Sequence, residues 1–357
     1  MTSEISFGVG CFNFGMKAGT TTTIGGYFNE LQNTFEAISN ISEIKIELDE
    51  EDYDFTAEIS ISTYDNMSVG GRINPNVRNV RISFDIFIPK RIQEDLKHDP
   101  KLFKTEKFRV VINYTYYFPV VIVQPFEPYG GDVDPSSAVV LVREFLIKEF
   151  LKIESFIDFQ VLGPSPFHGD FFVKENNQLE EKFQISIMET KAYDEINIYY
   201  NGYTDVNEAF EDITLEILEE FGFFYELMHK NLSSSMEWSF IEQNLDVLIS
   251  LKQERKKSKN LFLINRILND LFINISYFEK DQIFYKSYLQ KNRRNIIHFS
   301  SYIDREINEQ VNYPTSQVTE LIKLYENQKL NVNVILATVI AAISGGVMGA
   351  VITALFT

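Results

Sequence analysis

Residue types that often hold metals or cross-link small folds are scarce in this chain of 357 residues. Its single cysteine, Cys11, excludes an intrachain disulfide framework and any site built from several thiolates. The four histidines show neither an HExxH string nor a Cys/His metal-ligand spacing, so we expect no metal and no cofactor. Basic residues are also scarce, at 33 Lys and Arg against 51 Asp and Glu. The resulting net charge of −18 argues against general nucleic-acid binding, which needs a basic surface.

Hydrophobic residues, by contrast, make up 45% of the chain, which is enough to bury a sizeable core. At roughly 100–200 residues per domain, the length predicts two or three domains. The mean hydropathy of −0.12 averages over two very different parts, because a polar body precedes a wholly apolar C-terminal segment.

Residues 334–356 read VILATVIAAISGGVMGAVITALF, with neither charge nor proline. As a helix this segment would be roughly 35 Å long, enough to cross a hydrocarbon core of about 30 Å. The alternative, a buried helix of a water-soluble core, is rarely this long without a charged residue. The N-terminus carries Glu4 where a secretory signal would be basic. The sequence therefore predicts a single-pass, tail-anchored protein of the inner (cytoplasmic) membrane, with its main body in the cytoplasm.

Small residues recur every fourth position along this segment, which places them on one helix face. Such a row lets a second helix approach closely and contains a GxxxG pair. Small residues are common in membrane helices, so an anchor without specific packing is the alternative. The row predicts a homo-oligomer or a partner span, and its members are Ala337, Ala341, Gly345, Gly349 and Thr353.

Residues from about 43 to 202 are rich in the apolar–polar alternation that is typical of half-buried antiparallel strands. Helices are expected over residues 27–38 and after the DPSS string that contains Pro135 and Ser136. This mixture predicts an α+β domain with a mixed, mainly antiparallel sheet over residues 1–203. We interpret it as a sensor or binding domain for a protein partner or a small signalling ligand. The clearest strand places five residues on one face: Val80, Ile82, Phe84, Ile86 and Ile88.

From about Val206 the period changes to 3.6, which predicts an all-helical domain and stalk over residues 204–330. Breaks are expected at residues 233–235, a run of three serines, and at Pro314. Between them, residues 261–303 are expected to form a long helical region with one or two bends. After Pro314 one helix is expected to continue into the membrane segment, which we assign to residues 331–357.

Arg293 and His298 are separated by four residues within the predicted helical domain. This R-x4-H spacing is similar to the RNase motif of the HEPN family, in which Arg and His from paired helices act on an RNA phosphate. The resemblance implies a ribonuclease with His298 as general acid or base and Arg293 as phosphate clamp, where two copies meet. The sequence departs from the motif at Arg294, where a polar residue is usual. The alternative is a basic helix turn with a capping histidine.

A basic cluster stands out against the acidic background of the chain. In the membrane interpretation it contacts anionic headgroups, at about 1 kcal/mol per basic residue near the surface. The alternative is an exposed connector between two helices. Its members are Lys252, Arg255, Lys256, Lys257 and Lys259.

Three functions are compatible with this order of parts. The first is a non-enzymatic effector that senses a signal, oligomerises and perturbs or perforates the membrane, as single-span effectors do in bacterial anti-phage (antiviral) defence. The second is a membrane-anchored adaptor that recruits a protein partner. The third is the membrane-anchored HEPN-like ribonuclease. The absence of a strong catalytic motif favours the first two over an enzyme.

Overall fold

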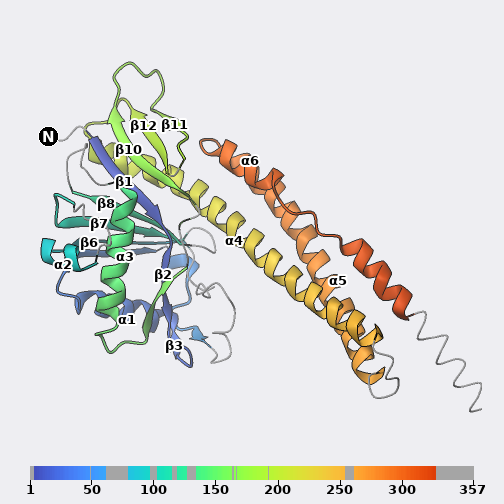
Figure 1. Cartoon of the computed structure of the whole chain (residues 1–357). Helices are drawn as coiled ribbons and strands as arrows, with labels where there is room; N and C mark the ends of the chain where they lie inside the picture. Colours follow the sequence, from blue (N-terminus) through green and yellow to red (C-terminus); the bar gives the residue numbers. More distant parts are fainter. Residues whose placement is uncertain are drawn as a thin grey trace, which may run out of the picture. The chain divides into compact units, whose positions relative to one another are not determined.

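The computed structural model describes residues 4–48, 50–61, 79–96, 103–114, 119–126, 134–162, 165, 167–191, 193–253 and 261–326. The chain divides into two compact units, residues 1–229 and 230–357. The first holds the strands and the second the later helices, so the predicted α+β class with a mainly antiparallel N-terminal sheet is confirmed (Figure 1). The predicted boundary at residue 203 precedes the last helix of the first unit, which belongs to that unit as far as His229.

An eight-stranded sheet forms the centre of the first unit, in the order β11-β12-β10-β1-β8-β7-β6-β4. Among the described strands, β10 and β12 form its one parallel pair. Two short two-stranded sheets accompany it. One pairs β2 (Phe12–Met16) with β9 (Ile157–Val161), and the other pairs β3 (Thr21–Thr23) with β5 (Glu58–Ser60). The strands of the large sheet are β1 (Glu4–Gly10), β4 (Ile41–Leu48), β6 (Val80–Phe87), β7 (Lys107–Asn113), β8 (Val120–Pro125), β10 (Gly169–Glu175), β11 (Phe183–Met188) and β12 (Asp194–Tyr200).

One face of the sheet packs against α1 (Ile24–Glu36) and α3 (Ser136–Phe150), with the short α2 (Lys90–Leu96) beside them (Figure 1). The five apolar residues expected inward on β6 and its end are all at most 1% exposed, which confirms the alternation. The first turn of α3 lies directly on β1. A Cβ on Gly8 would lie 2.7 Å from the carbonyl oxygen of Pro135, so this close approach requires glycine.

The opposite face of the sheet packs against the N-terminal half of α4 (Val206–Gln253). The rings of Phe7 and Phe210 lie 5.4 Å apart, at a distance typical of edge-to-face packing. The predicted break at residues 233–235 is wrong, because α4 continues through all three serines. Ser234 is buried there, and its hydroxyl accepts a hydrogen bond of 2.8 Å from the Gln282 side chain. A side-chain partner of this kind offsets the modest helix propensity of serine.

The second unit is a bundle formed by the C-terminal half of α4, α5 (Leu261–Asn292) and a helical segment over residues 315–326 (Figure 1). The predicted helical region 261–303 is interrupted by a 3-10 turn (Arg293–Asn295) before α6 (Ser300–Asn308). The predicted break at Pro314 is confirmed, since residues 310–314 lie outside helices. The buried core of the bundle comprises Trp238, Ile241, Leu248, Ile264, Leu268, Leu271, Ile275, Phe278, Val318 and Ile322.

The predicted transmembrane helix, with its row of small residues from Ala337 to Thr353, lies outside the described residues. Within the described ranges, no helix combines the length and the apolar character needed to cross a bilayer.

Candidate functional site

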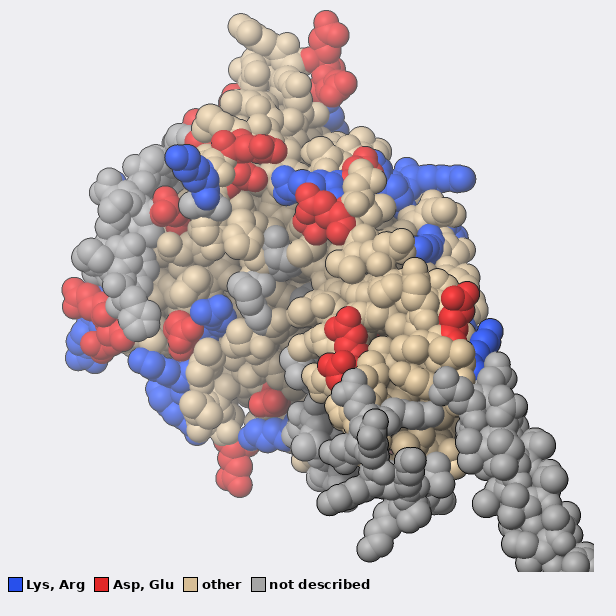
Figure 2. All heavy atoms as spheres, turned by 45° about the vertical axis from the view of Figure 1, so that its right-hand side comes forward, with Lys and Arg blue, Asp and Glu red and all other residues tan. Residues whose placement is uncertain are grey.

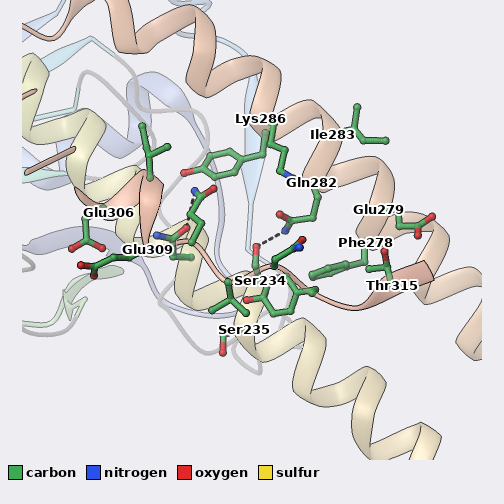
Figure 3. Close-up of a pocket in the computed structure, with 17 residues that line it drawn as sticks. Ser234, Ser235, Phe278, Glu279, Gln282, Ile283, Lys286, Glu306, Glu309 and Thr315 are labelled. Carbon is green, nitrogen blue, oxygen red and sulfur yellow. Dashed lines mark hydrogen bonds between the residues drawn. The ribbon is translucent and has the colours of Figure 1, made fainter. Parts of the chain in front are cut away.

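A cavity of about 790 Å³ opens in the second unit. Its walls come from α4, from the second half of α5 and from the end of α6 with the extended chain that follows (Figure 3). Two hydrogen bonds join these walls: Gln282 donates to Ser234 at 2.8 Å, and Gln310 donates to Asn231 at 3.2 Å. The cavity is therefore framed by contacts between distant parts of the chain and not by one loop.

The aromatic end of the cavity is fixed by three rings. Tyr313 packs against Trp238 and Phe278, with ring centroids 5.3 and 5.1 Å away. Tyr313 and Phe278 both line the cavity, and Thr315 follows as the first residue of the helical segment 315–326. The cavity thus combines an aromatic end with a polar remainder.

Carboxylates dominate the charged lining. Glu279, Glu306 and Glu309 line the cavity together with one ammonium group, that of Lys286 (Figure 3). Partial burial raises the pKa of Glu306, and the nearby charge of Glu309 raises it further. The site therefore suits a polar ligand that donates hydrogen bonds or carries positive charge.

The lining residues do not form an arrangement for covalent catalysis. None of them is a histidine or a cysteine, and the hydroxyl of Ser234 is bonded to an amide rather than to a base. Among the residues that the structure describes, no group of three or more His, Cys, Asp or Glu residues could hold a metal ion. The carboxylates and the ammonium group of the lining can bind a polar ligand.

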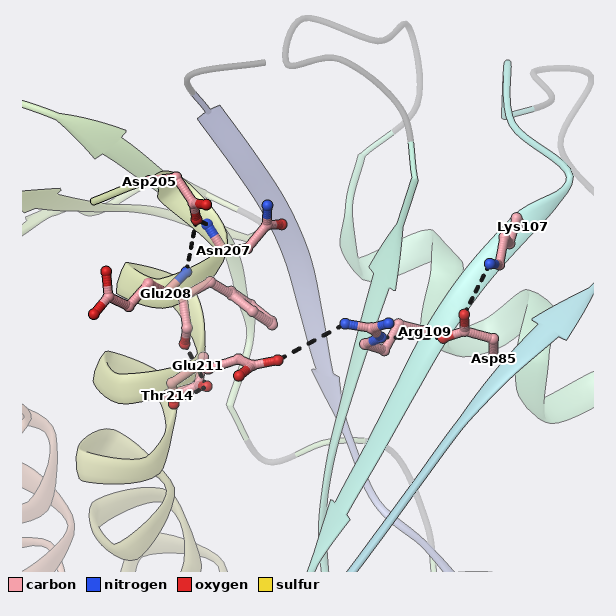
Figure 4. Close-up of polar contacts among 9 residues, drawn as sticks. Asp85, Lys107, Arg109, Asp205, Asn207, Glu208, Glu211 and Thr214 are labelled. Carbon is pink, nitrogen blue, oxygen red and sulfur yellow. Dashed lines mark hydrogen bonds and ion pairs between the residues drawn. The ribbon is translucent and has the colours of Figure 1, made fainter. Parts of the chain in front are cut away.

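A second polar site lies on the sheet. Asp85 of β6 is 3% exposed and contacts two cations of β7: the Nζ of Lys107 at 2.9 Å and the Nε of Arg109 at 3.0 Å (Figure 4). The Nη1 of Arg109 also lies 3.9 Å from Glu211 of α4. The ring of Phe126 lies 5.0 Å from Lys107 and 5.3 Å from the Arg109 guanidinium. Because both cations are already paired, this cluster is a structural link between strands and helix.

The Arg293 and His298 pair lies at the turn between α5 and α6, not within one helix. The guanidinium of Arg293 makes two contacts of 2.6 Å with the Asp304 carboxylate and donates to the Ile296 carbonyl oxygen at 3.1 Å. This bidentate pair lowers the pKa of Asp304. In this conformation Arg293 holds the α5–α6 turn, and a role as phosphate clamp requires Asp304 to be displaced.

No family model, curated protein or solved structure matches this chain. The interpretation of its sites therefore depends on their geometry.

The other predicted contact residues lie mostly outside the described residues. Arg255, Lys256, Lys257 and Lys259 belong to residues 254–260, and the backbone of Lys252 lies in the last turn of α4. Sequence reasoning missed the cavity, whose lining residues are polar, aliphatic and aromatic side chains without a motif, spread over more than 80 positions. It placed ligand binding in residues 1–203, whereas this cavity lies in the second unit. The one residue in the sequence that pointed to this region was Pro314, because it marks the end of the extended segment that lines the cavity.

Proposed function

We propose that this chain is a non-enzymatic, tail-anchored membrane protein that oligomerises through its C-terminal segment and perturbs the bilayer. Residues 334–356 supply the anchor, and their row of small residues supplies the contact between copies. The first unit and the cavity of the second unit provide surfaces for a partner or a polar ligand.

The observation that carries the proposal is the direction of the helical segment 315–326. The segment follows Tyr313, whose ring packs against Trp238 and Phe278. Two residues of the segment, Val318 and Ile322, lie in the core of the bundle. It therefore runs toward the end of the hairpin where α4 stops and α5 starts (Figure 1).

The described helix therefore ends, at residue 326, at the same end of the bundle at which α4 ends and α5 begins (Figure 1). Seven residues, 327–333, separate the described helix from residue 334, and even a fully extended chain of seven residues spans at most about 25 Å. A bilayer that holds the tail would then lie close to the connector that contains Arg255, Lys256, Lys257 and Lys259. Basic side chains at this place suit anionic headgroups.

The test uses the full chain in liposomes that contain anionic lipid. Extraction at alkaline pH measures whether the tail is integral, and leakage of an entrapped dye measures perturbation. Gly345→Leu with Gly349→Leu should abolish leakage and weaken the association of the C-terminal segments, and should leave the anchoring intact. The matched control, Val339→Leu with Val347→Leu, adds bulk to the opposite side of the segment and should retain both. Unchanged leakage of the glycine variant would contradict the proposed mechanism.

Replacing residues 334–356 with an unrelated apolar span distinguishes the effector from an adaptor. Leakage should disappear if the small residues act, whereas an adaptor that only needs an anchor would keep its function.

A further inference from the structure

The helical hairpin of the second unit exposes large apolar side chains on two opposite sides. The side chains on α4 are 40–57% exposed and are called the α4 face: Leu232, Met236, Phe240 and Val247. The side chains on α5 are 47–69% exposed and are called the α5 face: Phe272, Ile273, Tyr277, Ile283 and Phe284. At 3.6 residues per turn, each face lies opposite the residues with which its helix packs in the hairpin. Figure 2 shows one side of the molecule, on which the charged side chains stand in small groups with uncharged residues between them.

The charges around the two faces are complementary. Residues 231–251 contain Glu237, Glu242 and Asp246 and no lysine or arginine. The outward side of α5 carries the exposed cations Arg266, Lys280 and Lys291. Two of the three acidic residues of α5 pair with cations, Asp270 with Arg266 and Asp281 with Lys230, and the third, Glu279, lines the cavity, as Ile283 of the α5 face also does.

The two faces also lie at the same level along the hairpin. Ser234 contacts Gln282, and Trp238 contacts Phe278, so four residues along α4 correspond to four residues backward along α5. Leu232 and Phe240 therefore lie at the level of residues 284 and 276. The centres of the α4 face and the α5 face therefore lie at the same height along the axis of the hairpin.

We infer that the second unit associates with further copies of itself by packing the α4 face of one copy against the α5 face of the next. This inference rests on the proposed function in one respect: anchors in one bilayer hold all copies in the same direction. A rotation about the membrane normal keeps every residue at its own height, so two faces can meet only at equal levels. Faces on opposite sides of one unit give a head-to-tail contact, which forms a ring where the rotation between copies closes and an open row where it does not, rather than a simple dimer.

Exposed aromatic and aliphatic side chains at heptad-like spacing are the usual core of such helix packing. Tyr277 and Phe284 are seven residues apart on α5, as are Phe240 and Val247 on α4. Complementary charges beside the apolar residues select the opposite face in preference to a like face. The chemistry of the two faces therefore favours α4 against α5 over α4 against α4.

The test cross-links cysteines on the two faces of the full chain in liposomes. A double variant, Met236→Cys with Ser276→Cys, keeps every aromatic and charged side chain of both faces. These two positions point away from each other within one copy, so a short bismaleimide joins them only between copies. We expect a ladder of covalent dimers, trimers and larger species. Each single variant should give no covalent dimer, and the wild-type chain controls for the buried Cys11.

Phe240→Glu, added to the double variant, should reduce the cross-linked fraction by more than about tenfold, as expected for a central aromatic contact. Pairing Ser276→Cys with Leu324→Cys, an exposed position on helix 315–326, should give no ladder. Dimers from either single variant would show a like-to-like contact and overturn the inference, as would the absence of a ladder. Alkaline extraction tests the anchor separately: a retained chain without a ladder refutes the face pairing alone, and an extracted chain that still forms a ladder refutes the anchor alone.

Discussion

Removing the carboxylate of Asp85 is expected to weaken the first unit locally. Asp85 is buried, and its two cationic partners are 52% (Lys107) and 36% (Arg109) exposed. Hydrogen bonds to charged groups contribute about 1.5–3 kcal/mol each when they are buried. The exposed parts of both cations stay solvated and lower this contribution, so we expect Asp85→Ala to cost about 2 kcal/mol in all.

Hydrogen exchange followed by mass spectrometry measures this loss in the unit where it occurs. A loss of 2 kcal/mol should accelerate amide exchange in β6 and β7 by about 30-fold where exchange reports opening equilibria. Peptides from α5 serve as an internal control and should exchange at the wild-type rate. Lys107→Met should cost less than 1 kcal/mol, because this ammonium is half exposed. Equal effects of the two substitutions, or no effect of Asp85→Ala, would refute the reasoning.

Three further predictions concern stability. Gly8→Ala places a Cβ 2.7 Å from the Cα of Ser136 and should cost about 1–3 kcal/mol in urea unfolding, whereas a loss below 0.5 kcal/mol would show that α3 shifts freely. Asp170→Ala removes the acceptor of the Ser136 amide at the start of α3, a bond of 2.8 Å, and should cost about 1 kcal/mol in the same assay. Burial raises the pKa of Glu306 in the folded chain, so the folded state binds this proton more tightly than the unfolded state does. The resulting stabilisation is present below the ordinary pKa of glutamate and is lost as the pH rises through the raised pKa. Glu306→Gln should therefore match the wild type in acid and exceed its stability at neutral pH, as followed by Trp238 fluorescence; the opposite order would contradict burial as the cause.

Much of the sheet could be predicted from the sequence, because half-buried strands impose a period of two on their side chains. The alternation over residues 80–88 identified β6 and its inward face correctly. The apolar–polar alternation expected over residues 43–202 also covers the antiparallel pair of β11 and β12. The first strands were missed, since the glycines of β1 and β2 interrupt the apolar pattern. Those glycines serve close packing, as Gly8 does against α3, and a pattern of single residues does not contain that contact.

The two predicted breaks in the helices show what local helix propensity can and cannot predict. The helix α6 already ends at Asn308, and Pro314 directly precedes the helical segment 315–326, so this proline marks a position between two helices that could be predicted. The serines at 233–235 only lower helix propensity, and tertiary contacts decided the outcome. The cavity was beyond prediction for the same reason, because its walls come from residues that are brought together only by the bundle.

The position of Tyr313 links the two ends of the second unit. This residue lines the cavity and immediately precedes Pro314 and the helical segment 315–326. Anything that fills the cavity therefore touches the first turn of the same short helix whose other end leads to the apolar tail. A small displacement of that helix along its axis would be passed on undiminished over its roughly 18 Å length, since a single helix is stiff. Occupancy of the cavity at one end of this helix and the position of its other end, at Glu326, are therefore mechanically coupled.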